Sequence, residues 1–180
     1  MPIQTKLSCL IIDTMHESII PMLEEIGFSV AYEPTLSSTE IINKIHSYDG
    51  LILRSKITID IPFLEKASQL QFIARAGAGL ELIDQEEAKK KNIILLNAPE
   101  ANRDAVAEHT MGLLLSLLNK IPASHEQIKL KKWNREYFRG TELKGKTVGI
   151  IGYGFMGKAF AKKLSCFGCN VIAYDKTRFF

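Results

Sequence analysis

The sequence predicts an α/β fold, with one parallel sheet in its first part and the beginning of a second parallel sheet in its last part. Short apolar runs alternate with helical patterns up to Pro99, which is typical of parallel strands that are buried on both faces. A long apolar helix follows, and then a strand, a glycine-rich turn, a helix and another strand. We therefore expect two domains, residues 1–98 and residues 99–180.

Periodicity, turn residues and capping residues place the elements of the first domain. Ser37 or Ser38 begins the second helix, with Glu40 positioned as in a capping box. Pro62 fits the first turn of the third helix. The expected strands are 7–12, 28–32, 50–53, 70–75 and 93–96. The expected helices are 17–26, 38–46, 62–68 and 83–91.

The second domain begins after Asn97-Ala98-Pro99 with a long helix, 103–119. Its apolar positions are too many for one narrow stripe, so we expect burial on more than one side. Pro122 is expected to end this helix. The elements expected after it are a helix at 123–131, a strand at 147–151, a helix at 155–167 and a strand at 170–174.

Charge and composition exclude several classes of partner. The chain has 180 residues and a net charge of +3. Its basic residues are scattered, and the one tight run, Lys89 to Lys91, fits a solvated helix end. The sequence has no stripe of basic and aromatic residues, which is the pattern that would indicate nucleic-acid binding. The longest apolar run, 111–118, is too short to span a bilayer, and no signal peptide is visible.

The cysteines predict a reducing compartment, and we expect a cytoplasmic protein. Three cysteines are too few for a disulfide framework. Cys166 and Cys169 form a C-x-x-C pair, but it closes an expected helix, whereas a thioredoxin-like site opens one. We therefore expect no redox or metal site there, and two small buried residues around Gly168.

The strongest motif is a G-x-G-x-x-G turn formed by Gly152, Gly154 and Gly157. It follows an apolar strand and opens a helix, and Asp175 ends the next strand at about the ~20-residue separation of a dinucleotide-binding unit. Gly152 permits the tight turn, Gly154 lets a pyrophosphate approach the backbone, and Gly157 lets helix and strand pack closely. The acid would bind both ribose hydroxyls and repel a 2′-phosphate, which favours NAD over NADP.

A second glycine cluster, Arg75-Ala76-Gly77-Ala78-Gly79, also follows an expected strand. Arg54-Ser55-Lys56 follows the neighbouring one. Ligands of parallel sheets bind beyond the carboxyl ends of the strands. Two such loops, with cationic side chains and bare backbone N–H groups, would suit a small carboxylate or phosphate. Arg54 and Arg75 could equally be ordinary surface charges.

Several linked segments resemble the D-isomer-specific 2-hydroxyacid dehydrogenases over nearly the whole chain. They are R-S-K at 54–56, FIARAGAG at 72–79, the run from Asn97 to Leu118, and the run from Lys132 to Gly157. The K-W-x-R-x-x-F-x-G-x-E-L segment is most similar to the branch of the family that oxidises 3-phosphoglycerate in serine biosynthesis. The resemblance implies a flavodoxin-like substrate domain, a Rossmann NAD-binding domain, and a 2-hydroxy or 2-keto acid as substrate.

The resemblance also assigns site residues. The loop from Arg75 to Gly79 would hold the substrate carboxylate through N–H groups, with Ala78 near the nicotinamide. Arg135 would lie near the substrate phosphate of a neighbouring subunit. The expected substrate-binding residues are Arg54, Ser55, Arg75, Ala76, Gly77 and Arg135. The expected cofactor-binding residues are Ala78, Gly152, Gly154, Phe155, Met156, Gly157 and Asp175.

Three departures from the family pattern qualify these expectations. Glu81-Leu82 stands where relatives commonly have Asp-Asn, which weakens the substrate assignment. Phe155 replaces a frequent arginine, which removes one charge contact to the pyrophosphate. The family's catalytic arginine, glutamate and histidine are expected downstream of Phe180. No catalytic residue is therefore assigned, and the 180-residue chain alone is expected to be inactive.

Two alternatives stay open at this point. One is a glyoxylate, hydroxypyruvate or D-lactate reductase of the same fold. The other is a non-catalytic NAD-binding module. We also expect a homodimer or higher oligomer, because an incomplete sheet and the long helix would leave apolar surface uncovered, and the helix's counterpart lies at the family's dimer interface.

Overall fold

The computed structural model describes residues 6–176. The chain divides between Pro99 and Glu100 into two compact units, which we describe separately. We call them the first unit and the second unit. Among the described residues, no helix is both long and apolar enough to cross a membrane.

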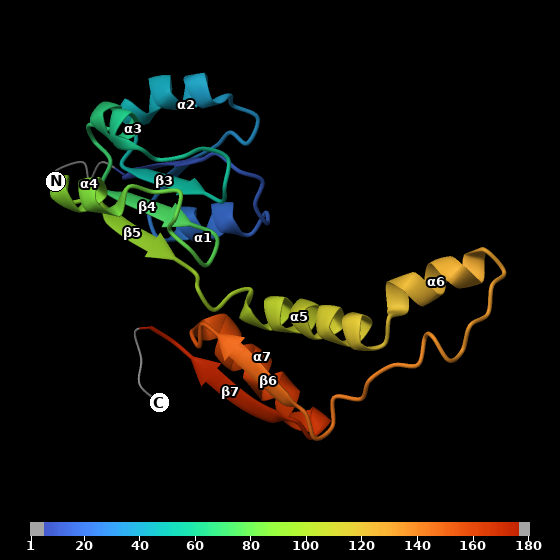
Figure 1. Ribbon diagram of the computed structural model, residues 1–180. Helices are drawn as coiled ribbons and strands as arrows, with labels where there is room; N and C mark the ends of the chain where they lie inside the picture. Colours follow the sequence, from blue (N-terminus) through green and yellow to red (C-terminus); the bar gives the residue numbers. More distant parts are fainter. Residues whose placement is uncertain (1–5, 177–180) are drawn as a thin grey trace. The chain divides into compact units, whose positions relative to one another are not determined.

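The first unit is built on a parallel sheet of five strands in the order β2-β1-β3-β4-β5 (Figure 1). The register pairs Leu10 with Leu51 and Leu51 with Ile73, so apolar side chains line up across the centre of the sheet. The strands are β1 (Ser8–Ile11), β2 (Ser29–Tyr32), β3 (Gly50–Leu53), β4 (Phe72–Arg75) and β5 (Ile94–Asn97). The carboxyl ends of all five therefore meet at one edge, as the alternating pattern predicts.

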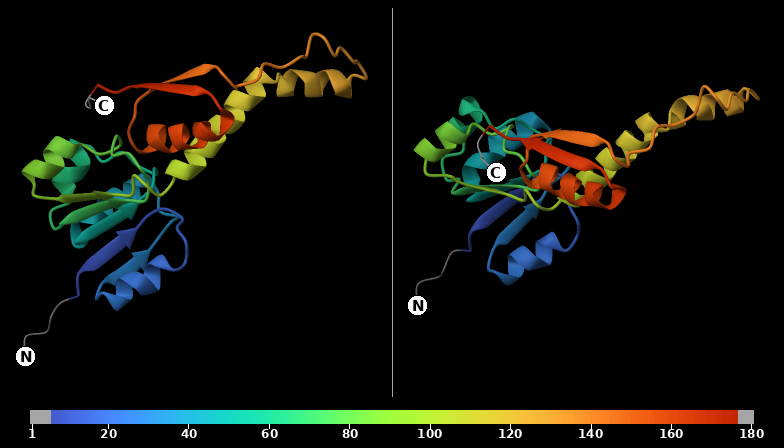
Figure 2. Two further views of the ribbon diagram at one scale, coloured as in Figure 1. Left: turned by 90° about the horizontal axis from the view of Figure 1, so that it is seen from below. Right: turned by 60° about the horizontal axis from the view of Figure 1, so that its bottom comes forward.

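Helices cover both faces of this sheet. Helix α1 (Ile19–Glu25) packs on the face formed by Cys9, Ile11 and Ile52. The larger core lies on the other face, beneath α2 (Ser38–Lys44), α3 (Ile61–Lys66) and α4 (Gln85–Lys90). A short 3₁₀ turn, η1 (Ile45–Ser47), extends α2. Figures 1 and 2 show α1 on the opposite side of the sheet from α2 and α3.

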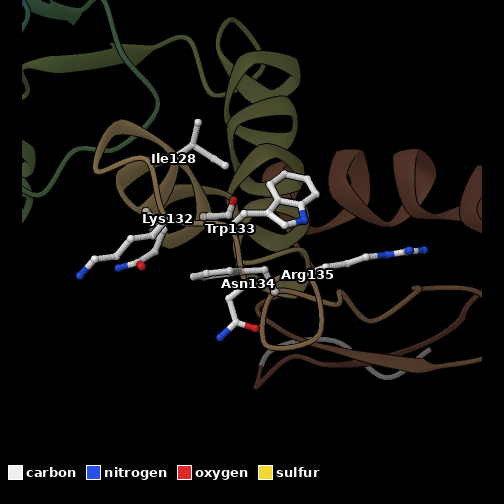
Figure 3. A pocket seen from close by; sticks show the side chains of 8 residues that line it. Ile128, Lys132, Trp133, Asn134 and Arg135 are labelled. Atoms are coloured by element: carbon white, nitrogen blue, oxygen red, sulfur yellow. The ribbon is translucent and has the colours of Figure 1, made fainter.

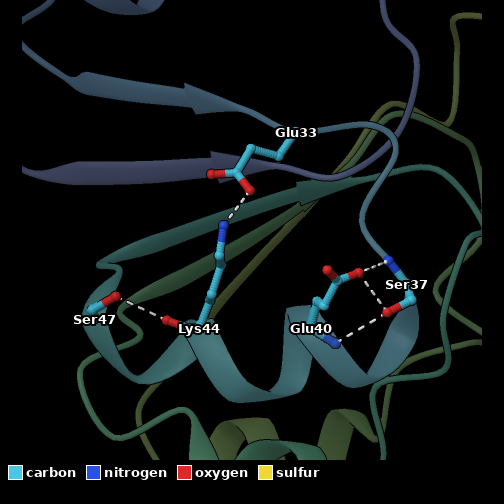
Figure 4. Close-up of polar contacts among 5 residues, drawn as sticks. All are labelled: Glu33, Ser37, Glu40, Lys44 and Ser47. Carbon is cyan, nitrogen blue, oxygen red and sulfur yellow. Dashed lines mark hydrogen bonds and ion pairs between the residues drawn. The ribbon is translucent and has the colours of Figure 1, made fainter.

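Helix α2 begins with the capping box that the sequence predicts, and Ser37 is its N-cap (Figure 4). The Glu40 N–H donates to Ser37 Oγ at 3.3 Å, and the Ser37 N–H donates to Glu40 Oε2 at 2.8 Å. The side-chain and backbone hydrogen bonds from Ser37 lower the pKa of the Glu40 carboxyl. Lys44, in the last turn, pairs with Glu33 at 2.5 Å. The box satisfies two N–H groups that the first turn leaves without helical partners.

In its described part, residues 100–176, the second unit contains two parallel strands and three α-helices. Strands β6 (Thr147–Ile151) and β7 (Asn170–Tyr174) are joined by α7 (Phe155–Leu164) and the 3₁₀ turn η2 (Ser165–Phe167). Helix α5 (Arg103–Leu118) packs against α7 around Met111, Ile150 and Leu164. The opposite face of this strand pair is open: Ile151 is 90% exposed and Ile172 62% exposed.

Three expectations about the second unit are wrong. Within the described chain, helix α5 is buried along one side only, because Leu113 (59% exposed) and Leu117 (75%) face away from the helix and strands it packs on. Pro122 does not end α5. It lies in the first turn of α6 (Ile121–Lys129), and Lys120, with a left-handed φ of 53°, separates the two helices. Cys166 is exposed, although Gly168 ends η2 as expected.

Asp49, which precedes β3, links the amino ends of β1, β3 and β4 by hydrogen bonds. Its Oδ2 accepts hydrogen bonds from the N–H and the Oγ of Ser8, both at 2.7 Å. Its Oδ1 accepts one from Gln71 Nε2 at 3.0 Å. The bonds from Ser8, first from its backbone and then from its side chain, lower the pKa of the Asp49 carboxyl. Asp49 therefore stabilises the fold more in its ionised form than in its protonated form.

Replacing Asp49 by Asn should lower the free energy of unfolding at pH 7. Because the folded-state pKa is lowered, the stabilisation is present above the unfolded pKa of about 3.9 and is lost as pH falls through the folded value. The difference between wild type and Asp49→Asn should therefore shrink below about pH 4. Urea unfolding between pH 7 and pH 2 measures this difference in the free energy of unfolding. Ser8→Ala should make the stability of the protein less dependent on pH, because it removes one of the hydrogen bonds that lower the pKa of Asp49. A constant difference across that range would contradict the assignment.

Candidate functional site

The turn between β6 and α7 has the geometry of the G-x-G-x-x-G motif. Gly152 has a φ of 91°, a left-handed conformation that favours glycine, and its N–H donates to Tyr174 O at 2.8 Å. A Cβ on Gly157 would overlap Gly152 O, so the helix can approach the strand only with glycine there. A Cβ on Gly154 would meet no atom within 4 Å. No contact within the described chain therefore requires glycine at position 154, and the space beside its backbone is open to a ligand.

The amino end of α7 carries backbone donors without acceptors. Helix α7 has no side-chain cap at Gly154. Within residues 6–176, the N–H groups of Phe155 and Met156 have no hydrogen-bond acceptor. The Lys158 N–H donates to Gly154 O at 3.1 Å, where the helical bonding begins. Free N–H groups at the positive end of a ten-residue helix form a site suited to phosphate.

Asp175 lies directly after β7 and beside this turn. Its Oδ2 accepts a hydrogen bond from the Tyr153 N–H at 2.8 Å, so the carboxylate also fixes the turn. A pocket of about 270 Å³ opens there. Its lining residues are Ile151, Gly152, Tyr174, Asp175 and Lys176. A partly exposed carboxylate at the carboxyl end of a parallel strand can accept hydrogen bonds from the hydroxyls of a ribose.

In the glycine loop after β4, in the first unit, the carbonyl groups of Gly77, Ala78 and Gly79 all accept hydrogen bonds. The Ala98 N–H donates to Gly77 O at 2.9 Å. Asn97 Nδ2 donates to Ala78 O at 2.6 Å. Arg75 Nη1 donates to Gly79 O at 2.6 Å. Because C=O and N–H point in opposite directions across a trans peptide, these bonds also set the directions of the N–H groups.

The N–H groups of this loop fall into two classes. The Ala76 N–H donates to Leu53 O and the Gly77 N–H to Arg75 O, both at 2.8 Å. Those of Ala78 and Gly79 have no acceptor in the part of the chain that the structure describes. An anion at this loop can therefore use the N–H groups of Ala78 and Gly79. The sequence pattern alone does not show that, within the described chain, the N–H groups of Ala78 and Gly79 are free whereas those of Ala76 and Gly77 are bonded.

The loop after β3 does not offer the bare N–H groups that we expected. Asp13 Oδ2 accepts hydrogen bonds from the N–H groups of Arg54 (2.6 Å), Ser55 (3.2 Å) and Lys56 (3.3 Å). Lys56 Nζ donates to Pro34 O. What remains for a ligand is the exposed side chains of Arg54 and Ser55. The expectation overlooked Asp13, although an acid at the end of the neighbouring strand is a visible signal.

The first unit brings together Arg54, Arg75 and the glycine loop, since Arg75 Nε donates to Arg54 O at 2.9 Å. A pocket of about 240 Å³ lies at the same sheet edge. It is lined by Ile19, Ile52, Ala74, Arg75, Ala76, Leu96, Asn97 and Ala98. Asn97 is a second residue that the motif analysis missed, because its role depends on a contact with Ala78 across the sheet edge.

Arg135 lies apart from the glycine turn of its own unit, in the segment after α6. It lines a pocket of about 280 Å³ together with Trp133 and Phe138. Figure 3 shows the side chains of this pocket, including Ile128 from α6. The Trp133 residue is 79% exposed and Ile128 52% exposed. The pocket is therefore a shallow apolar surface with Arg135 at its rim.

Comparison with known proteins gives consistent matches along the chain. The model of the D-isomer specific 2-hydroxyacid dehydrogenase catalytic domain matches residues 9–177. D-3-phosphoglycerate dehydrogenase of Methanocaldococcus jannaschii is 44% identical over 168 residues, which are 92% of this chain and 32% of that protein. The chain thus spans about a third of the length of the curated relatives it matches.

Solved structures agree with the predicted fold class. NAD+-bound 3-phosphoglycerate dehydrogenase of Entamoeba histolytica superposes with a TM-score of 0.78 at 28% identity, covering 98% of this chain and 56% of that one. An acyclic imino acid reductase in complex with NADPH and D-Arg gives a TM-score of 0.85 at 27% identity, covering 97% and 58%. The sequence motifs, the parallel sheets and the family match together show that this chain belongs to the D-isomer-specific 2-hydroxyacid dehydrogenase family.

Proposed function

We propose that this chain carries the NAD-binding turn and the substrate loops of an oxidoreductase that acts on the CH–OH group of a D-2-hydroxy acid. The observation that carries the proposal is the pair of N–H groups of Phe155 and Met156, which have no acceptor within residues 6–176 and lie beside Gly154 and Asp175. In a bound dinucleotide, the pyrophosphate would lie on those N–H groups and the ribose of the adenosine would lie on Asp175.

Asp175 is the basis for proposing NAD in preference to NADP. Two proteins of similar fold differ in this respect, since one is described with NAD+ and the other with NADPH. Residues near the cofactor, and not the fold, therefore determine whether NAD or NADP binds. A carboxylate at the ribose repels a 2′-phosphate, and Lys176 supplies a cation next to it. We propose that the closer interaction, with Asp175, dominates.

The substrate that we propose is 3-phosphoglycerate, in serine biosynthesis. Its carboxylate would bind the N–H groups of Ala78 and Gly79, and its phosphate would be attracted to Arg54 and to Arg135 of a neighbouring subunit. The support is the K-W-x-R segment and the names of the relatives, which are D-3-phosphoglycerate dehydrogenases. By the resemblance, the arginine, glutamate and histidine that perform the hydride and proton transfer lie after position 180.

Two other functions compete with this one. A glyoxylate, hydroxypyruvate or D-lactate reductase would share the fold, but no specific residue here favours it over the phosphoglycerate branch. A non-catalytic NAD-binding module would bind the cofactor without turnover. The three unpaired thiols suit the reducing cytoplasm that we propose for any of these functions.

We also propose that the protein forms a homodimer through α5, α6 and the segment that follows them. Large apolar side chains gather there without cover from the described chain. They include Leu117 (75% exposed), Ile128 (52%), Leu130 (62%), Trp133 (79%) and Tyr137 (65%). Exposed apolar groups that are adjacent along the chain favour association with a surface of similar character.

Two glycine substitutions should separate cofactor binding from folding. Gly154→Ala should leave the free energy of unfolding almost unchanged, because its Cβ enters open space, and should weaken NAD binding by tenfold or more, on the order of one lost phosphate contact. Gly157→Ala should destabilise the chain by about 1–3 kcal/mol, since its Cβ meets Gly152 O. Calorimetric titration and urea unfolding measure the two effects. Unchanged NAD affinity in Gly154→Ala would contradict the proposed site.

The Asp175→Asn variant tests the choice of cofactor. Asn keeps an oxygen that can accept the Tyr153 N–H, but it removes the negative charge that faces the 2′ position. Wild type should bind NAD more tightly than NADP, and the variant should shift that ratio toward NADP by about tenfold. Parallel titrations with both cofactors give the ratio. Equal ratios in wild type and variant would show that Asp175 does not select the cofactor.

A substitution in the apolar segment tests association. Leu130→Glu should raise the dimer dissociation constant by about tenfold or more, because a charge would be buried in the interface. Ile26→Glu is the matched control, since Ile26 is similarly exposed (70%, against 62% for Leu130) but lies in the first unit. Sedimentation velocity over a concentration series reports the constant. A wild-type chain that stays monomeric, or equal effects of both variants, would contradict the proposed dimer surface.

A further inference from the structure

Arg75 contacts the protein's own backbone on two sides. Its side chain is only 13% exposed. Nε donates to Arg54 O at 2.9 Å, in the loop after β3, and Nη1 donates to Gly79 O at 2.6 Å, in the loop after β4. One planar guanidinium therefore joins the two loops at the edge of the sheet. Hydrogen bonds from a charged donor are about twice as strong as neutral ones, so this link is stiff.

Glu81 neutralises the same guanidinium. Its Oε1 lies 2.8 Å from Arg75 Nη1. The pKa of the Glu81 carboxyl is lowered by a hydrogen bond from its own backbone and then by the bond from Arg75. The carboxylate folds back over Gly79, where a Cβ would overlap it. Glu81 is one of the residues that depart from the usual family pattern, and in this chain it is an ion-pair partner.

The two loops are also held from their other sides. The Arg54 N–H donates to Asp13 Oδ2 at 2.6 Å, so that the backbone of Arg54 is fixed by Asp13 at its N–H and by Arg75 at its C=O. Asn97 and the Ala98 N–H hold the preceding carbonyls of the glycine loop. Arg75 completes this set at Gly79 O. Across each trans peptide, the bonds to Gly77 O and Ala78 O set the directions of the Ala78 and Gly79 N–H groups, and the bond from Arg75 to Gly79 O fixes the end of the same loop.

We propose that Arg75 is a positioning residue, which with Glu81 fixes the glycine loop so that the N–H groups of Ala78 and Gly79 bind the substrate carboxylate, and which does not itself contact the substrate. This inference rests on the proposed function only for the identity of the ligand. Arg75 acts through the backbone because its Nε and Nη1 donors are engaged there, and because Glu81 offsets its charge.

The experiment measures the binding of 3-phosphoglycerate to the 180-residue chain by following the amide signals of Ala78 and Gly79 in ¹⁵N–¹H spectra. Arg75→Met should raise the dissociation constant by about tenfold or more. Arg75→Lys should raise it at least about fivefold, because lysine has a methylene where Nε stood and cannot donate to Arg54 O from there. A direct charge contact would instead survive in Arg75→Lys.

Glu81→Gln should change the affinity for 3-phosphoglycerate in opposite directions, depending on whether Arg75 positions the loop or contacts the substrate. If Arg75 is a positioning residue, losing its partner loosens the loop and weakens binding by about two- to fivefold. If Arg75 contacts the substrate, losing a nearby negative charge frees a cation and tightens binding of an anion. Glu65→Gln is the matched control, because Glu65 is exposed in α3 and has no ion pair among the described residues. Binding within about twofold of wild type is expected for it.

A measurement without ligand keeps this inference separate from the proposed function. In the ligand-free chain, ¹⁵N relaxation of Ala78 and Gly79 should resemble that of β4 in wild type and show added mobility in Arg75→Met. Unchanged relaxation in the variant, wild-type affinity in Arg75→Lys, or tighter binding in Glu81→Gln would each overturn the positioning role. A rigid wild-type loop that does not bind 3-phosphoglycerate would instead overturn the proposed substrate site.

Discussion

The backbone groups that leave a parallel sheet at its carboxyl edge must find new hydrogen-bond partners, and much of this structure follows from how they do so. Side chains supply the partners at each turn described above. Asp13 accepts three N–H groups of the loop after β3, and Asp175 accepts the Tyr153 N–H after β6. Asn97 and Arg75 donate to carbonyls of the loop after β4.

The groups that stay without partners then define the places where a ligand can bind. In the described chain they include the N–H groups of Ala78 and Gly79 in the first unit and of Phe155 and Met156 in the second. All four are donors, so both places suit anionic groups. A carboxylate and a pyrophosphate are the anions that a 2-hydroxy acid and NAD would present. Each unit would thus bind its anionic ligand in the proposed reaction through backbone N–H groups that have no partner within the described chain.

Local sequence patterns predicted the elements well where a single residue type decides the conformation. The strands Thr147–Ile151 and Asn170–Tyr174 have the predicted bounds, because glycine turns delimit them. The capping box at Ser37 was also predicted, since both partners lie within one helical turn. The fold class followed from the same local signals, because alternation of buried strands and helices leaves few other architectures.

Contacts between distant residues were not predictable in the same way. Asp13 is 41 positions from Arg54, and nothing in the R-S-K motif indicates that its N–H groups are already bonded. The pairing of Arg75 with Glu81 depends on the fold of the intervening glycine loop. Within one chain, α5 is buried on fewer sides than expected, because apolar composition does not show which sides have a packing partner in the same chain. Those apolar sides are the ones we assign to a second copy.

Amide hydrogen exchange, resolved by residue, tests most directly the division between bonded and open N–H groups. We predict that Arg54, Ser55, Lys56 and Tyr153 are protected in the ligand-free protein, and that Ala78, Gly79, Phe155 and Met156 are not. Addition of 3-phosphoglycerate should protect Ala78 and Gly79, and NAD should protect Phe155 and Met156. Protection of these four amides before any ligand is added, or ligand protection confined to other segments, would contradict the account.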